Sequence, residues 1–168
     1  MSDMSILGLP AEITDRIELH PIEHIMLQCL RESLPDSPIY SMIPFDQTAL
    51  GDYFILVRRL PGWGIWDGDD RFVDFAGVGV HVFAKDPNAD TKAAVISEAV
   101  RVAIRDATKA RAYYPGLGGL VKVRMDEEPV RRTDWATSSG PVQFADLPAG
   151  YQRYEARYSV WIRRPIWG

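Results

Sequence analysis

The residues that could do chemistry in this chain are three histidines and a short run of aspartates. His20 and His24 are four residues apart with Glu23 between them, a spacing that can place two imidazoles on one helix face as metal ligands. No third ligand is evident nearby, and Pro21 makes His20 the residue before a helix start. We therefore interpret this pair as the beginning of a helix rather than as a metal site.

Asp67, Asp69, Asp70 and Asp74 form an acidic cluster between two predicted strands. Paired carboxylates can bind Mg²⁺ or Ca²⁺, or can do acid–base chemistry. The sequence D-G-D-D lacks the spacing and the bidentate glutamate of a calcium loop, so a turn with solvated charges is the simpler interpretation. A small metal-dependent hydrolase or ligand-binding domain that uses the Asp67–Asp74 cluster is the alternative function from another class.

His81 lies beside glycines in a predicted strand and has no serine or cysteine nucleophile motif near it. A catalytic base could sit there, but a core or interface histidine is the simpler interpretation. The glycine-rich stretches 62–68 and 116–119 match neither the dinucleotide-binding fingerprint nor a P-loop. We therefore predict that the protein is not an enzyme, with no catalytic residue, no cofactor and no metal site.

Composition narrows the class of protein. A chain of 168 residues fits one domain and buries enough surface to need no disulfide or metal. The net charge is −4 without any basic block, which argues against a nucleic-acid surface held by phosphate contacts. The single cysteine, Cys29, fits a reducing compartment. No apolar run is long enough to span a membrane and the N-terminus carries acids, so we expect synthesis in the cytoplasm.

The elements that would position these residues centre on the stretch from Arg71 to Asp106. Its first half alternates valines with other residues at period two, which predicts a strand. Val73 and Phe75 have the opposite parity from the later valines, so we expect a β-bulge near Gly77. The later valines are Val78, Val80 and Val82.

A helix is predicted after Pro87, because apolar residues recur there at spacings of three and four. We expect Asp90 to accept hydrogen bonds from the free N–H groups at the start of this helix. The predicted apolar stripe consists of Val95, Ile96, Ala99, Val100, Val102, Ala103 and Ala107.

The predicted helices and strands follow one another along the chain in the order α-β-β-α-β-β. This order predicts a single α+β domain over residues 1–168, with a mostly antiparallel sheet and two helices packed on it. The pair Asp67-Gly68 predicts a hairpin turn between the first two strands. We expect an arm over residues 1–20 and a long loop over 127–150, helices near 21–34 and 90–110, and strands near 53–60, 71–84, 120–126 and 153–163.

The tryptophans fall on predicted loops, on the polar side of a strand, or at the C-terminus. Tryptophan and arginine outside a core are typical of contact surfaces, although a solvated sheet face is the alternative for the last strand, which we expect to be half-exposed. We predict an interface formed by the hairpin loop, the long loop and the residues on the polar side of the last strand. Its residues are Trp63, Trp66, Asp67, Asp69, Asp70, Trp135, Arg153, Arg157, Trp161 and Arg163.

Four stretches of the chain, together with the acidic loop, resemble one protein family. They read FILVRRLPGWG, VGVHVFAKD, ADTKAAVISEAVRVAIRD and YEARYSVWIRRP. In their order along the chain and in their pattern of residue types, they resemble the tail terminator proteins of long-tailed phages, especially those of actinobacterial hosts. The resemblance covers about residues 21–165. The chain differs from shorter members of that family in its 127–150 loop and in its tryptophan-rich hairpin.

This resemblance implies a structural virion protein of the tail or neck, without catalytic residues and without a membrane association. Family members form a homo-hexameric ring that caps the tail tube and joins the tail to the head, while the genome DNA passes through the lumen without sequence-specific binding. The implied partners are further copies of the chain, the tail tube protein and the head-closure or connector protein. By the same analogy the loops 61–70 and 127–150 reach toward the lumen or the tube. Another head–tail joining protein or a tail tube protein is the alternative within this class.

Overall fold

The computed structural model describes residues 22–44, 46–65, 73–132 and 150–163, together with Gly8, Pro10 and Glu12. Within these ranges the chain forms two long helices and a six-stranded sheet. The helices are α2 (Ile22–Ser33) and α3 (Ala89–Lys109). The strands are β1 (Ile39–Tyr40), β2 (Tyr53–Ile65), β3 (Asp74–Lys85), β4 (Tyr113–Tyr114), β5 (Gly118–Arg132) and β6 (Tyr151–Arg163).

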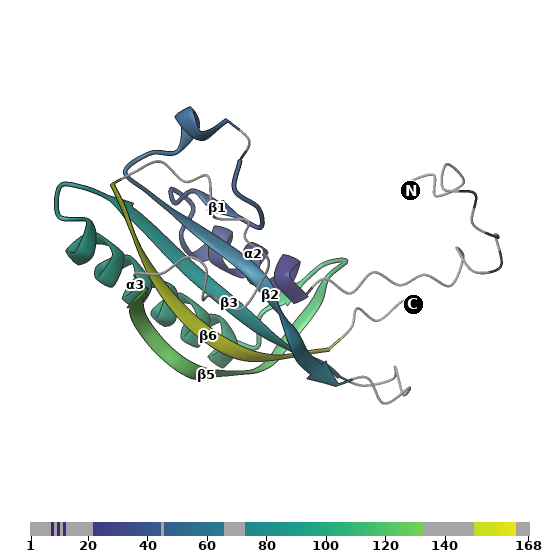
Figure 1. Cartoon of the computed structure of the whole chain (residues 1–168). Helices are drawn as coiled ribbons and strands as arrows, with labels where there is room; N and C mark the ends of the chain where they lie inside the picture. The colour runs from purple at the N-terminus through teal and green to yellow at the C-terminus, as the bar shows by residue number, and fades with distance from the viewer. Residues whose placement is uncertain are drawn as a thin grey trace.

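The sheet has the strand order β1-β2-β3-β6-β5-β4. All neighbouring strands are antiparallel except the short β1, which runs parallel to β2. Figure 1 shows the sheet curving strongly, with both helices on one of its faces. The protein is therefore a single α+β domain with a mostly antiparallel sheet, as the sequence predicts, and the hairpin of β2 and β3 is confirmed.

The main core lies between the helices and the sheet. Each strand contributes every second side chain to this core, because side chains alternate between the two faces of the sheet. On β3 these are Val78, Val80 and Val82, which are all buried, and on β6 they include Tyr158 and Val160. We call the opposite face, which carries no helix, the second face of the sheet.

A smaller apolar cluster lies on the second face, over β2 and β3. Phe54 and Phe83 stack there with ring centroids 4.5 Å apart, and Leu50 and Leu56 pack beside them. The middle of the sheet is therefore buried on both faces, which explains why β2 begins with a nearly continuous apolar run.

The predicted β-bulge near Gly77 is wrong. β3 pairs with β6 without interruption from Asp74 to Lys85. The irregularity lies instead in β2, between Arg59 and Gly64, where Pro61 has no N–H to give to the ladder. Phe75 consequently stays on the second face.

The predicted role of Asp90 at the start of α3 is also wrong. The N-cap residue is Asn88, which has a left-handed backbone (φ 62°) and makes no side-chain cap hydrogen bond. Asp90 lies one residue inside the helix and reaches across to the sheet. Its carboxylate accepts a hydrogen bond from the Tyr154 hydroxyl at 2.9 Å and lies 3.8 Å from the Arg131 guanidinium.

The buried stripe of α3 is narrower than the predicted one. Val95 and Val102 are 63% and 37% exposed, so two members of the predicted stripe face away from the sheet. Spacings of three and four alone allow a stripe wider than the face that the sheet covers. The residues that are buried are Ala89, Ala93, Ser97, Val100, Ala103 and Ile104.

The predicted long loop over 127–150 is shorter than expected, because β5 continues to Arg132. Residues 133–149 lie outside the described part of the chain, as do nearly all of the residues of the predicted arm. The short strands β1 and β4 were not predicted, since two residues are too few to show any periodicity.

The buried face of α3 can be tested with one substitution on each side of the helix. Val100 is 1% exposed, so Val100→Asp buries an unpaired charge and should lower the free energy of unfolding by about 3–4 kcal/mol. Glu98 is exposed and pairs with Arg101 at 2.7 Å on the helix surface, so Glu98→Ala should leave the free energy of unfolding nearly unchanged. Urea denaturation measures both. Equal losses of stability would contradict this orientation of the helix.

Candidate functional site

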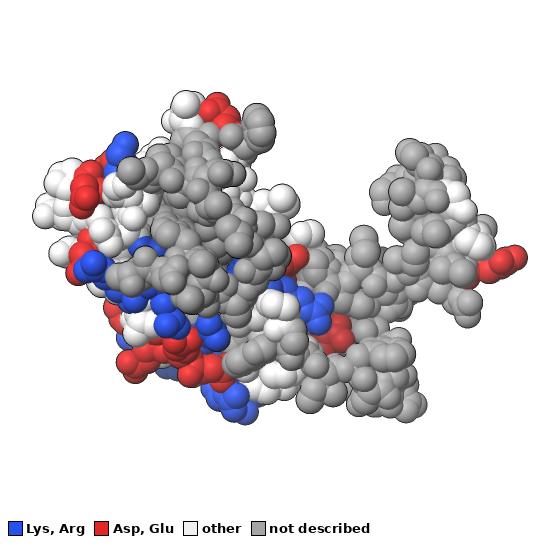
Figure 2. Space-filling view, in the orientation of Figure 1, with Lys and Arg blue, Asp and Glu red and all other residues white. Residues whose placement is uncertain are grey.

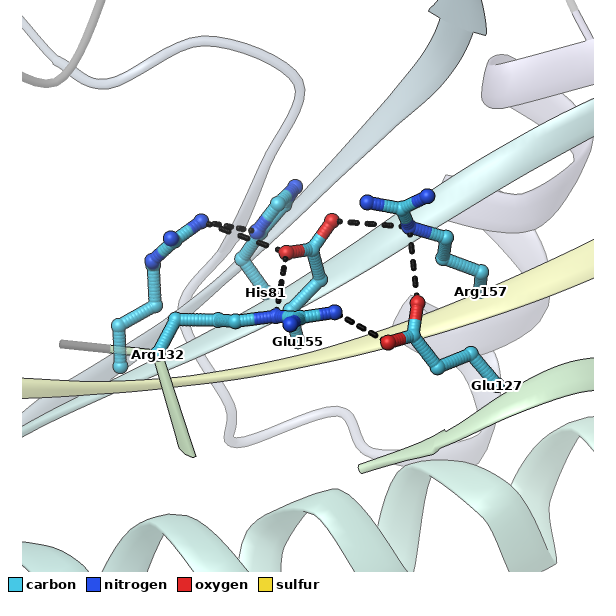
Figure 3. Close-up of polar contacts among 6 residues, drawn as sticks. His81, Glu127, Arg132, Glu155 and Arg157 are labelled. Atoms are coloured by element: carbon cyan, nitrogen blue, oxygen red, sulfur yellow. Dashed lines mark hydrogen bonds and ion pairs between the residues drawn. The ribbon is translucent and has the colours of Figure 1, made fainter. Parts of the chain in front are cut away.

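Charged side chains gather on the second face, where β3, β6 and β5 lie side by side. Strand register places His81 beside Glu155 and Arg153 beside Arg132. Because these positions share one parity, all four side chains project from the same face. Figure 3 shows how they converge. We call the set formed by Glu127, Arg132, Arg153, Glu155 and Arg157 the arginine–glutamate network.

Glu155 lies at the centre of this network and is fully buried. Its Oε2 atom lies 3.2 Å from Nε of Arg132 and 3.7 Å from Nη1 of Arg153, and its Oε1 atom lies 3.3 Å from Nε of Arg157. A buried carboxylate is costly unless it is paired and hydrogen-bonded. Three guanidinium groups supply that pairing here.

Glu127 is the second carboxylate of the network. It accepts a hydrogen bond from Nη2 of Arg132 and lies 3.0 Å from Nε of Arg157. The register of β5 against β6 shifts on both sides of Glu127. Such bulges re-aim the side chains of a strand, and here they place Glu127 opposite Arg157. Arg132 and Arg157 therefore each contact both glutamates.

His81 extends the network onto β3. Its Nδ1 atom lies 3.3 Å from Nη1 of Arg153. Because a guanidinium can only donate, Nδ1 accepts this hydrogen bond and the neutral ring carries its proton on Nε2. Burial lowers the pKa of His81 well below its ordinary value, and nearby arginines, Arg153 first among them, lower it further. The ring is therefore neutral at neutral pH.

The prediction that the polar parity of the last strand faces solvent is wrong at its centre. Arg153 is 1% exposed and Glu155 is fully buried, while Arg157 is half-buried. Charged residues normally indicate a solvated face. Here the charges pair with one another across strands, so they can be buried together.

Trp161 lies further along the same face of β6. Its ring packs on Phe75 with centroids 4.7 Å apart. Lys122 Nζ lies 5.1 Å from the centre of the indole and Arg124 Cζ lies 6.0 Å from it, both within the range of cation–π attraction. Arg163, at the end of β6, is exposed. The structure thus brings Trp161 and three predicted interface arginines onto one strand face.

The carboxylate of Asp126 holds Arg124, one of the two cations that lie beside Trp161. It accepts a hydrogen bond from the Ser159 hydroxyl, and its other oxygen lies 2.6 Å from Nε of Arg124. Sequence analysis missed Asp126, Glu127 and Arg132 as members of the site. Val121, Val123 and Met125, which alternate with Lys122 and Arg124, give a strand pattern only as far as residue 126, because the bulges interrupt the alternation that follows.

The remaining predicted interface residues are not placed by the structure. Trp63 belongs to β2, but its side chain lies outside the described set. The other five are outside the described residues and stay predictions: Trp66, Asp67, Asp69, Asp70 and Trp135.

Within the four described ranges, no group of three or more histidine, cysteine, aspartate or glutamate side chains could hold a metal ion. None of the helices described is long and apolar enough to cross a membrane. Of the predicted helix-start group, His24 is exposed, and Glu23 accepts a hydrogen bond at 3.0 Å from the backbone N–H of Arg59.

Comparison with known proteins does not assign a function. No protein-family model matches the chain, and no curated protein matches it. One solved structure aligns over 100% of this chain and 99% of its own, at 13% identity and with a TM-score of 0.32. That likeness is too low to carry an argument, and its description gives no activity. The function has to be inferred from the residues themselves.

The central role of Glu155 predicts a large loss of stability when its charge is removed. Glu155→Gln keeps the shape of the side chain but leaves three arginines without their shared buried counter-charge. The free energy of unfolding should fall by about 3–5 kcal/mol, as measured by chemical denaturation. Glu128→Gln is the matched control, because Glu128 is an exposed glutamate on β5. It should change stability by about 0.5 kcal/mol or less, and a similar loss in both variants would contradict the network.

The pKa of His81 predicts how stability depends on pH. The folded-state pKa lies below the unfolded value of about 6.5, so below that pH the unfolded chain binds a proton that the folded chain does not. Stability should therefore fall with pH below about 6.5, by up to about 1.4 kcal/mol per pH unit from this residue. His81→Gln should flatten the pH profile of the melting temperature between about pH 6.5 and 5. His24→Gln controls for the loss of a histidine, and identical slopes in wild type and both variants would contradict the burial of a neutral His81.

Proposed function

We propose that the protein is a structural subunit of a phage tail, a tail terminator without enzymatic activity. In this proposal six copies form a ring that caps the tail tube and joins the tail to the head through the neck, while DNA passes through the lumen. The partners are other copies of the chain, the tail tube protein and the head-closure protein. The protein acts in the virion tail or neck after synthesis in the host cytoplasm.

The order of the elements supports this proposal. A helix, a hairpin, a second helix and a second hairpin follow one another as α2, β2–β3, α3 and β5–β6. This is the order that the sequence resemblance implies for the family. Because one fold can carry many functions, the order is compatible with the proposal without selecting it.

The observation that carries the proposal is the state of the charged groups on the second face. Glu127 and Glu155, which could otherwise serve as acids or bases, are each held by at least two guanidinium groups. Catalytic acids and bases need access to a substrate. A carboxylate at the centre of an ion-pair network instead favours a rigid structural role, and the arginines and Trp161 on the same face are residue types enriched in interfaces.

The edges of the sheet favour contacts through side chains rather than through added strands. β4 covers only the first two residues of β5, and the rest of that strand carries register shifts, Pro129 and many charges. These features protect an exposed edge from pairing with another chain. Figure 2 shows basic and acidic side chains intermixed on one side of the molecule rather than separated by sign. A closed ring needs two different, complementary patches of this kind on each subunit.

The proposal can be tested at the hairpin between β2 and β3, where two tryptophans lie next to the aspartates in the sequence. Leaving two indoles in water forgoes a few kcal/mol of burial, at roughly 25 cal/mol per Å², and a partner surface would recover it. The double variant Trp63→Ala, Trp66→Ala should therefore fold as an isolated subunit but fail to enter tails. Electron microscopy of a lysate in which the variant complements a deletion should show over-long or headless particles.

The matched control is the thermal melting curve of the isolated double variant, which should superimpose on that of the wild type. Normal tails and full infectivity from a folded double variant would contradict the interface assignment. A deletion that leaves tail length and head attachment unchanged would contradict the proposed function itself.

A further inference from the structure

Arg157 has an unusual position within the network. Both of its ion pairs use Nε, which lies 3.0 Å from Glu127 and 3.3 Å from Glu155. Within the described residues neither terminal Nη group makes a hydrogen bond, and the side chain is 24% exposed. Figure 3 shows Nε of Arg157 joined by a dashed line to each of the two carboxylates. The guanidinium is therefore fixed through Nε, while the side chain stays partly accessible to a partner.

The surroundings of this fork are rich in positive charge. Arg58 on β2, Gly79 on β3 and Arg157 on β6 lie in one row across the sheet. Arg58 loses some basicity because burial lowers its pKa, and the charge of Arg157 lowers that pKa further while Glu155 raises it. With Arg132 and Arg153, the described part of this region holds four arginines against Glu127 and Glu155. A fixed fork in a positive field is suited to a planar oxyanion.

We propose that the outer edge of Arg157 is a receptor for carboxylates on an acidic segment of a second copy of this chain. This proposal rests on the proposed ring and names one of its contacts. The chain itself contains a suitable segment, because Asp67, Asp69 and Asp70 lie within four residues of one another beside Trp66. A carboxylate matches the bidentate geometry of a guanidinium. The receptor and the acidic segment are different parts of the sequence, as a head-to-tail contact between copies requires.

A carboxylate partner is favoured over nucleic acid by the character of the surface. Binding to a DNA backbone draws on many exposed lysines and arginines that release counterions together. Here Arg132 and Arg153 pair with glutamates of the same fold, Arg157 is itself held by two glutamates, and the chain carries a net charge of −4. A single fixed fork is better matched to a short acidic peptide.

The test uses the full-length chain and a synthetic peptide with its residues 63–72, which read WGIWDGDDRF. Isothermal titration should show binding that depends on the three aspartates, so a peptide with asparagine at positions 67, 69 and 70 should not bind. Arg157→Gln should weaken binding at least about tenfold, since it removes a charge-assisted bidentate contact. Arg105→Gln is the matched control, because Arg105 is exposed on α3, on the other side of the sheet from Arg157, and it should bind as the wild type does.

Arg157→Lys guards against a loss of folding. It keeps a positive charge near Glu127 and Glu155 but lacks the fork, so it should retain the wild-type circular dichroism spectrum and still weaken binding. Equal affinity of wild type and Arg157→Lys for the peptide would overturn the proposal. Binding of inorganic phosphate at Arg157 without any binding of the peptide would also overturn it, and would point to nucleic acid instead.

Assembly experiments separate this proposal from the ring proposal. If the peptide binds at Arg157 but the protein forms no rings and does not affect tail length, the receptor stands and the proposed function fails. If folded Arg157→Lys forms normal rings and complements fully, the receptor is not a ring contact and this inference fails, while the proposed function stands.

Discussion

The structure depends most on the burial of one carboxylate. Glu155 is fully buried, and an ionised carboxylate in that position is tolerated only because three guanidinium groups surround it. Those groups come from β5 and β6, and His81 on β3 contacts one of them. The pairing of three strands is thereby tied to one register. A slip of β6 by one residue would turn Glu155 toward the apolar core beneath the helices, where no positive charge would meet it.

The two faces of the sheet therefore contribute to the fold in different ways. The helix side is held by the burial of apolar side chains such as Val80 and Val160, which is strong but non-directional. The second face is held by directional contacts that exist only in one arrangement. The bulges around Glu127 belong to this second system, because they supply the carboxylate that Arg157 and Arg132 share. Irregularity in β5 is thus part of what fixes the sheet.

The sequence predicts the elements that have a long, regular period, and fails where a single residue breaks the period. The position of α3 follows from apolar residues at spacings of three and four. The face of β6 that carries Arg157 and Trp161 follows from period-two alternation. Parity predicts a bulge at Gly77, whereas the irregularity lies beside Pro61, because parity alone does not show which of two paired strands carries the extra residues. The sequence likewise predicts a loop at Glu127, because the bulges on both sides of it break the alternation of β5. The burial of Arg153 had no local signal, since its cause is the pairing of strands distant in the sequence.

The same network links stability to recognition. A free arginine on a surface loses side-chain entropy when it binds, at a cost of about 0.5–1.5 kcal/mol per immobilised side chain. Arg157 is already held by Glu127 and Glu155 in the folded protein, so this cost is met during folding rather than during association. A subunit that joins a ring through several weak contacts gains from each side chain fixed in advance. The buried carboxylate that constrains the sheet would then also determine how the outer edge of Arg157 meets a neighbouring copy.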